Sequence, residues 1–432
     1  MSERTLQERQ ARARGDRAAP ARGAPVNGGP TAVADVELEQ LPPGLEGLGA
    51  ATQALVLVRM RGAPVTEVRV PVEDGRVGAQ ALAQAVAEGT TPAVWRRWLS
   101  ERVEAVRPPG RAARRATVAV IARDRPDELR HCLDALVRLP DDGQELLVLD
   151  VSNSGDAVRE LVARHPGVRR VRPAEPGLSA ARNRAVREAR HEVVAFLDGD
   201  AAPDAGWLRA LLANFDDPLV ACVTGMVMPL ELETPAQEWA ERLQPQARRL
   251  VRRVHDAADT HPLRAPRAGG GANFALRRDA VARVGPFDEA LGPGTPARGG
   301  AVTELWTRLL AAGERIVYDP AALAWRRPRR TWEELRQTVY DRGVGAGAAW
   351  SRSLAVDGEW AAIPIAFGVL VRDRLPTLYR SMLRRPGAPP LDLALAELRG
   401  CAAGPWAYWE ARRGSGPRAA PPRDDPARES VS

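Results

Sequence analysis

The central region of the chain, residues 117–350, is predicted to fold as a parallel, doubly wound α/β sheet. Two observations predict this fold class. Short apolar runs alternate with segments of helical spacing through the first half of the region. Polar residues also follow directly after three of the expected strands. Because such sheets bind ligands at the carboxyl ends of their strands, these polar residues are expected around one crevice.

The elements follow one another in a regular order. Strands are expected at residues 117–122, 145–150, 168–171 and 192–197, and helices at residues 126–139, 157–164 and 178–190. The runs TVAVIA and EVVAFL are typical of strands buried on both faces. Pro126 opens the first helix at a position that tolerates proline. The polar groups after the strands lie in residues 122–125, 150–154 and 198–200.

Composition divides the flanks into smaller units. Residues 31–105 are predicted to form a small α+β module, with strands at 33–38, 54–60 and 66–70 and helices at 78–88 and 92–99. Residues 106–116 form a linker, and residues 351–412 a helical extension. The low-complexity residues 1–30 and the Pro-rich residues 413–432 are expected to be disordered.

Charge and cysteine content narrow the possible partners. The net charge is +7, but all 62 basic residues are arginine, which together with frequent Ala, Gly and Pro indicates a coding bias. No nucleic-acid motif accompanies the charge, so no nucleic-acid partner is expected. Three scattered cysteines fit a reducing cytosol, and the longest apolar run, residues 361–371, is too short to span a membrane. We expect a cytoplasmic protein whose excess charge suits a phosphate-bearing substrate or peripheral contact with the inner face of the cell membrane.

The chemistry is expected at Asp198-Gly199-Asp200. Two carboxylates one residue apart, directly after a buried strand, can hold Mg²⁺ or Mn²⁺ from one side and leave the other positions to diphosphate oxygens and water. Such an ion stabilises a departing nucleoside diphosphate. The alternative is a polar turn, because Asp-Gly is a favoured turn pair. The preceding strand and the sequence of residues 203–207 favour the metal site.

A series of segments, in this order, resembles the family 2 glycosyltransferases, which have the GT-A fold. They are TVAVIARDRPDELRHCLDAL, ELLVLDVSNS, PGLSAARNRAVREAR, FLDGDAAPDAGWLRALL, VTGMVMP, GGGANFALRRDAVARVGPFDEALGPGTPARGG and RIVYDPAALAW. The flanks resemble those of a bacterial subgroup with an extra N-terminal module. The resemblance implies a mostly parallel sheet with helices on both faces and metal-dependent, inverting transfer of a sugar from a nucleotide-sugar donor. The acceptor would be a carbohydrate, a lipid-linked molecule or a small molecule. The donor sugar, the nucleotide and the oligomeric state stay open.

The resemblance also implies a role for particular residues. They are Ala122, Arg123, Asp150, Arg182 and Asp198 for the nucleotide, Asp198 and Asp200 for the metal, Gly270, Gly271 and Asn273 for the acceptor side, and Arg326 for the diphosphate. Blander alternatives exist for some of them. Arg182 could be a solvated charge on a helix, the glycines of residues 269–271 could form only a flexible turn, and Trp207 is favoured as core packing rather than sugar stacking.

The chain departs from the family pattern at the general base. In the family, ARGG is followed by Glu-Asp, whose acid takes the proton from the acceptor hydroxyl. Here Ala301 and Val302 follow instead, and neither can accept a proton. Glu304 is the nearest substitute, although a helix that begins near Ala301 would turn it away from the direction of Val302.

Two further positions depart from the family pattern. Arg326 stands where the family has a histidine that helps at the diphosphate and metal; a guanidinium cannot bind the metal but can neutralise a diphosphate. Val151 replaces a second acidic residue. Two hypotheses therefore stay open. One is an active glycosyltransferase with Glu304 or the substrate as base, and the other is a degenerate homologue that binds a nucleotide sugar and partners or regulates an active enzyme. The retained DGD sequence favours the first.

Overall fold

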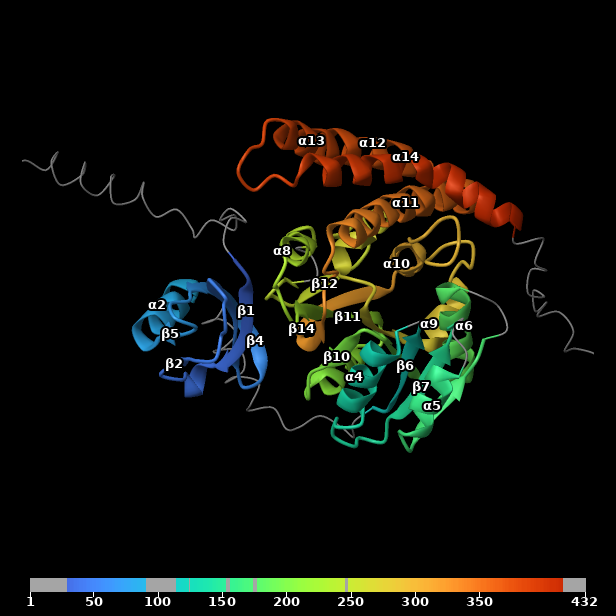
Figure 1. Cartoon of the computed structure of the whole chain (residues 1–432). Coiled ribbons are helices and arrows are strands. Elements are labelled where there is room, and N and C mark those ends of the chain that lie inside the picture. The colour runs from blue at the N-terminus through green and yellow to red at the C-terminus, as the bar shows by residue number, and fades with distance from the viewer. Residues whose placement is uncertain are drawn as a thin grey trace, which may run out of the picture.

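The computed structural model describes residues 29–90, 114–123, 125–152, 156–173, 177–244 and 248–414. Its centre is a nine-stranded mixed sheet with the order β10-β14-β11-β13-β9-β6-β7-β8, in which β12 also pairs with β14 (Figure 1). The strands are β6 (Ala116–Ala122), β7 (Glu145–Asp150), β8 (Val168–Val171), β9 (Val193–Asp198), β10 (Ala201–Pro203), β11 (Val220–Pro229), β12 (Arg253–His255), β13 (Asn273–Arg277) and β14 (Arg315–Arg326).

Six of the nine strands of this sheet run in one direction, and β10, β12 and β13 run in the other. The pairs β6–β7, β7–β8, β6–β9 and β11–β14 are parallel, whereas β13 runs antiparallel to β9 and β11. β10 and β12 run antiparallel to β14. The predicted fold class, an α/β domain with a mostly parallel sheet, is confirmed. The strands from β10 onward were not predicted individually.

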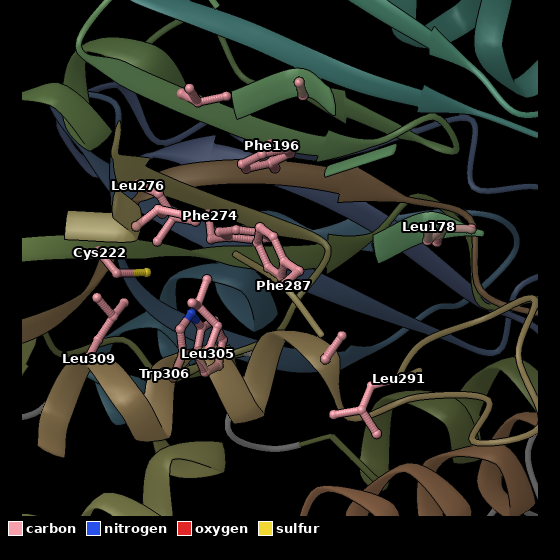
Figure 2. Packing of buried hydrophobic residues seen from close by; sticks show 14 of the residues in the cluster. Leu178, Phe196, Cys222, Phe274, Leu276, Phe287, Leu291, Leu305, Trp306 and Leu309 are labelled. Atoms are coloured by element: carbon pink, nitrogen blue, oxygen red, sulfur yellow. The ribbon is translucent and has the colours of Figure 1, made fainter. Parts of the chain in front are cut away.

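Helices cover both faces of the sheet, as a doubly wound fold requires. They are α4 (Pro126–Leu136), α5 (Ala157–Ala163), α6 (Leu178–Glu188), α7 (Trp207–Ala213), α8 (Pro235–Arg242), α9 (Arg278–Val284) and α10 (Ala301–Ala311), with the 3₁₀ segments η2 (Asn214–Asp216) and η4 (Pro262–Ala268). Successive residues of β6 point to opposite faces, so Val120 packs with α4, α5 and α7, and Ile121 packs with α6, α9 and α10. On the face that holds Ile121, the rings of Phe196 and Phe274 stack with their centroids 4.9 Å apart, above Trp306 of α10 (Figure 2).

The N-terminal module has its own core. Its three-stranded sheet has the order β1 (Thr31–Glu37), β3 (Gln53–Met60), β4 (Ala63–Pro71), and the short strands β2 (Gly44–Leu45) and β5 (Val77–Gly78) pair with each other. The 3₁₀ segment η1 (Leu38–Gln40) follows β1, and α2 (Ala79–Gly89) packs on β4. The predicted helix at 92–99, the linker up to residue 113 and the terminal segments 1–28 and 415–432 lie outside the described residues.

A separate hydrophobic cluster joins the N-terminal module to the central sheet. Leu55 and Leu57 of β3 are buried together with Met226, Met228 and Tyr318 of β11 and β14. Polar contacts reinforce the joint. The Arg59 guanidinium contacts Asp35 at 2.6 Å and Asp204 at 2.7 Å, and it lies 5.7 Å from the ring centroid of Trp325. The module is therefore packed beside the end of β14, next to Arg326.

The C-terminal helices form a layer on the outside of the central domain (Figure 1). They are α11 (Trp332–Asp357), α12 (Ala362–Val369), a π-helical turn (Leu370–Arg374), α13 (Leu375–Met382) and α14 (Leu391–Gly414). α11 runs without a break through residue 350, where the sequence suggested a boundary.

Glycines bring α11 and α14 together at backbone distance. A Cβ added to Gly347 would lie 2.5 Å from the carbonyl oxygen of Cys401, and one on Gly404 would lie 2.6 Å from Gly347 Cα. Gly345, between Gly343 and Gly347 in the same helix, contacts a different partner: its Cβ would lie 2.7 Å from the backbone nitrogen of Gly300. α11 is thus held between α14 and the loop that leads into α10.

Candidate active site

The polar residues at the strand ends meet at one edge of the sheet. In the strand register Ala122 is beside Asp150, and Ile121 is beside Asp198. The backbone N–H of Asp198 donates a 3.0 Å hydrogen bond to the carbonyl oxygen of Ala272, which brings the glycine-rich segment to the same edge. The structure therefore places Ala122, Asp150, Asp198 and the glycine-rich segment near one another.

A guanidinium lies against the two carboxylates of the DGD sequence. Arg326 Nη2 is 3.1 Å from Asp200 Oδ2, and Arg326 Nη1 is 3.9 Å from Asp198 Oδ2. Strand pairing explains this position, because Ala201 of β10 faces Arg326 of β14 in the register. The charge of Asp200 raises the pKa of Arg326, and burial raises the pKa of Asp198. A second guanidinium, that of Arg329, lies 3.8 Å from Asp200 Oδ2.

One carboxylate oxygen of this cluster is unused. Asp200 Oδ1 is buried and has no hydrogen-bond partner among the described residues. Within the same described part of the chain, no group of three or more His, Cys, Asp or Glu side chains is placed to hold a metal ion. The cluster thus offers two carboxylates with one unpaired buried oxygen, together with two guanidinium groups that can face a diphosphate.

Arg182 is buried beside this cluster, so it is not the solvated helix charge of the alternative interpretation. Its side chain on α6 is 6% exposed, and its guanidinium lies 5.8 Å from the ring centroid of Phe287. Burial lowers its pKa, while the charge of Asp198 acts in the opposite direction. Its Nε has no hydrogen-bond partner among the described residues. A buried donor of this kind suits an anionic ligand.

Asp150 is engaged on both carboxylate oxygens. Its Oδ1 accepts a 2.6 Å hydrogen bond from the Ser152 hydroxyl, and its Oδ2 accepts bonds of 2.9 and 2.5 Å from Arg170 of β8. Burial raises the pKa of Asp150, but these hydrogen bonds outweigh burial, so its pKa lies below the usual value. The carboxylate therefore holds β7 to β8. The contact with a nucleotide base implied by the family resemblance stays a prediction.

Asn273 and Gly271, in the glycine-rich segment, have different surroundings. Asn273 is fully buried, where its Nδ2 donates to the carbonyl oxygens of Met226 and Ala322 and its Oδ1 accepts from Trp207 Nε1 at 2.7 Å. Because these bonds occupy its amide, we propose that Asn273 joins strands rather than binding the acceptor. Trp207 is core packing, as the sequence favoured. Gly271, in contrast, faces the next element: a Cβ there would lie 3.3 Å from Val302 Cγ2.

The position of the expected base is apolar. Val302 is partly buried in the first turn of α10, opposite Gly271, and Ala301 is 2% exposed within the hydrophobic cluster. Glu304 points elsewhere and is 1% exposed. Its Oε1 contacts Arg308 Nε at 2.6 Å and Arg352 Nη1 at 2.8 Å, and its Oε2 accepts from Arg308 Nη2 at 2.8 Å. Both oxygens are occupied by guanidinium groups, which leaves Glu304 poorly placed to accept a proton from an acceptor.

Residues 117–285 match the model of glycosyl transferase family 2. This stretch of the central domain is therefore similar to that family. Curated relatives of the chain are the pre-mycofactocin glycosyltransferases of Mycobacterium tuberculosis strains CDC 1551 / Oshkosh and ATCC 25618 / H37Rv, which are 29% identical over 278 residues. The alignment covers 61% of this chain and 53% of the relatives, so the chain spans about half the length of these curated relatives.

Solved structures similar to this chain include two enzymes in complex with a nucleotide or nucleotide sugar and Mn²⁺. The mannosyltransferase PcManGT from Pyrobaculum calidifontis, in complex with GDP-Man and Mn²⁺, is 19% identical with a TM-score of 0.41, over 76% of this chain and 84% of that chain. Glucosyl-3-phosphoglycerate synthase from Mycobacterium tuberculosis, with Mn²⁺, UDP and phosphoglyceric acid, is 19% identical with a TM-score of 0.39, over 56% and 78%.

Several side chains that contact the candidate site residues were not predicted from the sequence. They are Arg329 beside Asp200, Arg170 on Asp150, and Arg308 and Arg352 on Glu304. Arg308 had a detectable signal, because it lies one helical turn after Glu304. Arg329 lies in the basic run that follows Trp325. The sequence holds no signal for Arg352, because only the packing of α11 brings it to α10.

Proposed function

We propose that this chain is a glycosyltransferase that transfers a sugar from a nucleoside-diphosphate donor to an acceptor hydroxyl with inversion at the anomeric carbon. The single observation that supports it most is the cluster of Asp198, Asp200 and Arg326 at the strand ends of a family 2 domain. Transfer forms a bond from the acceptor oxygen to the anomeric carbon while the bond from that carbon to the diphosphate breaks. The site must therefore neutralise the departing diphosphate.

Arginine side chains supply most of this neutralisation in the proposal. Arg326 and Arg329 lie at Asp200, and the buried Arg182 is close enough to Asp198 to influence its pKa. Guanidinium groups match phosphate oxygens in geometry and keep their charge at any working pH. The unpaired Oδ1 of Asp200 fits a cation ligand. Asp198 and Asp200 would hold Mg²⁺ or Mn²⁺, which adds positive charge at the diphosphate when bound.

The acceptor side is proposed at Gly270, Gly271 and Val302. Gly271 lies directly against Val302, because a Cβ at Gly271 would be 3.3 Å from Val302 Cγ2. Val302 cannot take the proton of the acceptor hydroxyl, so another group of the substrates or solvent receives it in this proposal. The curated relatives are named for transfer to pre-mycofactocin, and that molecule belongs in an acceptor panel for this chain. The loss of the base also favours the second candidate, a nucleotide-sugar binder with little activity.

The proposal is tested by transfer and donor hydrolysis against a panel of nucleotide sugars with Mn²⁺ present. We expect at least one donor to be consumed by the parent protein and spared by Asp200→Ala. Asp216→Ala, which removes a side chain that is 79% exposed on η2, is the matched control and should behave like the parent. Donor binding without turnover would favour the binder, and an absence of both would refute the assignment.

The thermal stabilisation by nucleotide should have two separable contributions, one that requires the metal ion and one that persists in EDTA. UDP or dTDP is expected to raise Tm more in Mn²⁺ or Mg²⁺ than in EDTA, with a shift that grows with ligand concentration. Asp200→Ala should remove the metal-dependent part, because the ion loses its unpaired carboxylate oxygen. Arg326→Ala should instead lower the part that persists in EDTA, because the diphosphate loses a guanidinium. Thermal unfolding of each variant with and without nucleotide measures both parts.

Either variant contradicts the proposal if its thermal shift with nucleotide equals that of the parent protein. An Asp200→Ala protein with the metal response of the parent would mean that the DGD sequence is only a turn. An Arg326→Ala protein with an undiminished shift in EDTA would place the diphosphate away from β14. Asp216→Ala again serves as the control, because η2 lies outside the cluster.

A further inference from the structure

The helical layer at the C-terminus exposes a row of large apolar side chains. Only Ala362 of α12 and Ser381 of α13 are buried, and the π-helical turn between them buries no residue. We call this row the apolar ridge. It consists of Trp360, Ile363, Phe367, Val371, Leu375 and Tyr379, whose exposed fractions range from 41% to 73%. Figure 1 shows α12 and α13 on the outer side of the layer, away from the central sheet.

The spacing of the ridge keeps its side chains on one side of the helical run. From Ile363 to Tyr379 an apolar residue recurs at every fourth position. In a regular α-helix such a repeat drifts by about 40° per step. The π-helical turn at Leu370–Arg374 contains extra residues per turn and offsets part of that drift. A continuous exposed apolar row of this kind marks an interaction surface, since monomeric proteins rarely leave one uncovered.

The charges beside the ridge indicate what covers it. Residues 360–385 contain five arginines and one aspartate, a local net charge of +4. Arg372, Arg380, Arg384 and Arg385 are exposed and form no ion pair with a carboxylate of the described residues. Basic residues interleaved with Trp, Phe and Leu are typical of helices that lie in the interface of an anionic bilayer. A second copy of the chain would bring the same positive charge to the facing surface, which is unfavourable, whereas lipid phosphates would neutralise it.

We propose that the apolar ridge docks on the surface of an anionic lipid bilayer. Trp360, Phe367 and Tyr379 would enter the boundary between headgroups and acyl chains, and the neighbouring arginines would contact the phosphates. The chain would lie on the bilayer rather than cross it. No helix in the described part of the chain is long and apolar enough to reach from one side of a membrane to the other. This surface is separate from the nucleotide site, so the inference does not depend on the proposed function.

Co-sedimentation of the full chain with vesicles tests the inference. We expect the protein to bind vesicles of phosphatidylglycerol and phosphatidylcholine, and to bind pure phosphatidylcholine at least tenfold more weakly. High salt should weaken the binding to anionic vesicles, because it screens the arginine–phosphate attraction. The fluorescence of Trp360, which is 73% exposed, should shift to shorter wavelength as its ring leaves water.

Two variants separate the apolar and the electrostatic contributions. Phe367→Asp should lower vesicle affinity by about tenfold or more, because the phenyl ring no longer enters the bilayer and its transfer free energy from water is lost. Arg380→Glu combined with Arg384→Glu should remove the preference for anionic lipid. Val137→Asp is the matched control: Val137 is also exposed, at 46%, but lies after α4, and its change should leave binding intact. Circular dichroism checks that each variant is folded.

Other outcomes would overturn the proposal. Equal binding of neutral and anionic vesicles, or no binding to either, would exclude an anionic bilayer as the partner. A parent protein that is dimeric, does not bind vesicles and becomes monomeric on Phe367→Asp would show that a second copy covers the ridge. Unchanged vesicle binding by Phe367→Asp would place the lipid contact on another surface.

Discussion

Val302→Asp is expected to raise sugar transfer by about 10²–10⁴-fold, the usual contribution of a positioned general base. Val302 lies in the first turn of α10 and faces Gly271 across the acceptor side of the site. A carboxylate there would reach the acceptor hydroxyl that the valine cannot deprotonate. Restoring the whole Glu-Asp pair is less suitable, because Ala301 is 2% exposed in the hydrophobic cluster and a glutamate would bury a charge.

Val302→Asn is the matched control for this gain. Its amide has the shape and polarity of the aspartate but cannot accept the proton, so transfer should stay at the level of the parent. Initial rates with the best donor, together with nucleotide affinity, distinguish catalysis from binding. If Val302→Asp leaves the rate unchanged while the donor still binds, then the acceptor or another residue already supplies the base.

Glu304→Gln is expected to lower the free energy of unfolding by about 3–5 kcal/mol, the usual cost of removing one partner from a buried ion pair. Glu304 has no exposed side-chain surface, and Arg308 and Arg352 are 12% and 10% exposed. Solvent therefore screens this cluster little. Removing the carboxylate charge leaves the Arg308 guanidinium without its counter-charge between α10 and α11, whereas Arg352 keeps its ion pairs with Asp288 and Asp357. Denaturant unfolding of parent and variant measures the change.

The same variant decides whether Glu304 serves as the base. If Glu304 has a structural role, Glu304→Gln should destabilise the protein strongly. Below the unfolding temperature, transfer per folded molecule should then be nearly unchanged. A general base predicts the reverse, with stability kept and transfer lowered by about 10²–10⁴-fold. Glu333→Gln is a useful control, because Glu333 pairs with Arg336 on the exposed side of α11 and should cost little.

The regular strands and helices were predictable from the sequence, whereas contacts between residues far apart in the chain were not. The strands β6 to β9 and the helices between them were predictable because period and apolar runs are local properties. The position of the DGD sequence beside the ends of β6 and β7 was predictable because strand ends converge in a parallel sheet. The pairing of Arg326 with Asp200 depends on the register of β10 with β14. The structural use of Asn273 likewise depends on three strands meeting around one amide.

The close glycine contacts between α11 and α14 also limit how the chain can change in length. Gly343 and Gly347 meet Gly400 and Gly404 in a single register, since a Cβ at any of these positions would overlap the opposite backbone. Inserting or deleting one residue within either helix would rotate the glycines away and bring side chains into the contact. Related sequences are therefore expected to vary in length at the loops, residues 358–361 and 383–390, while both helices keep a constant number of residues between their glycines.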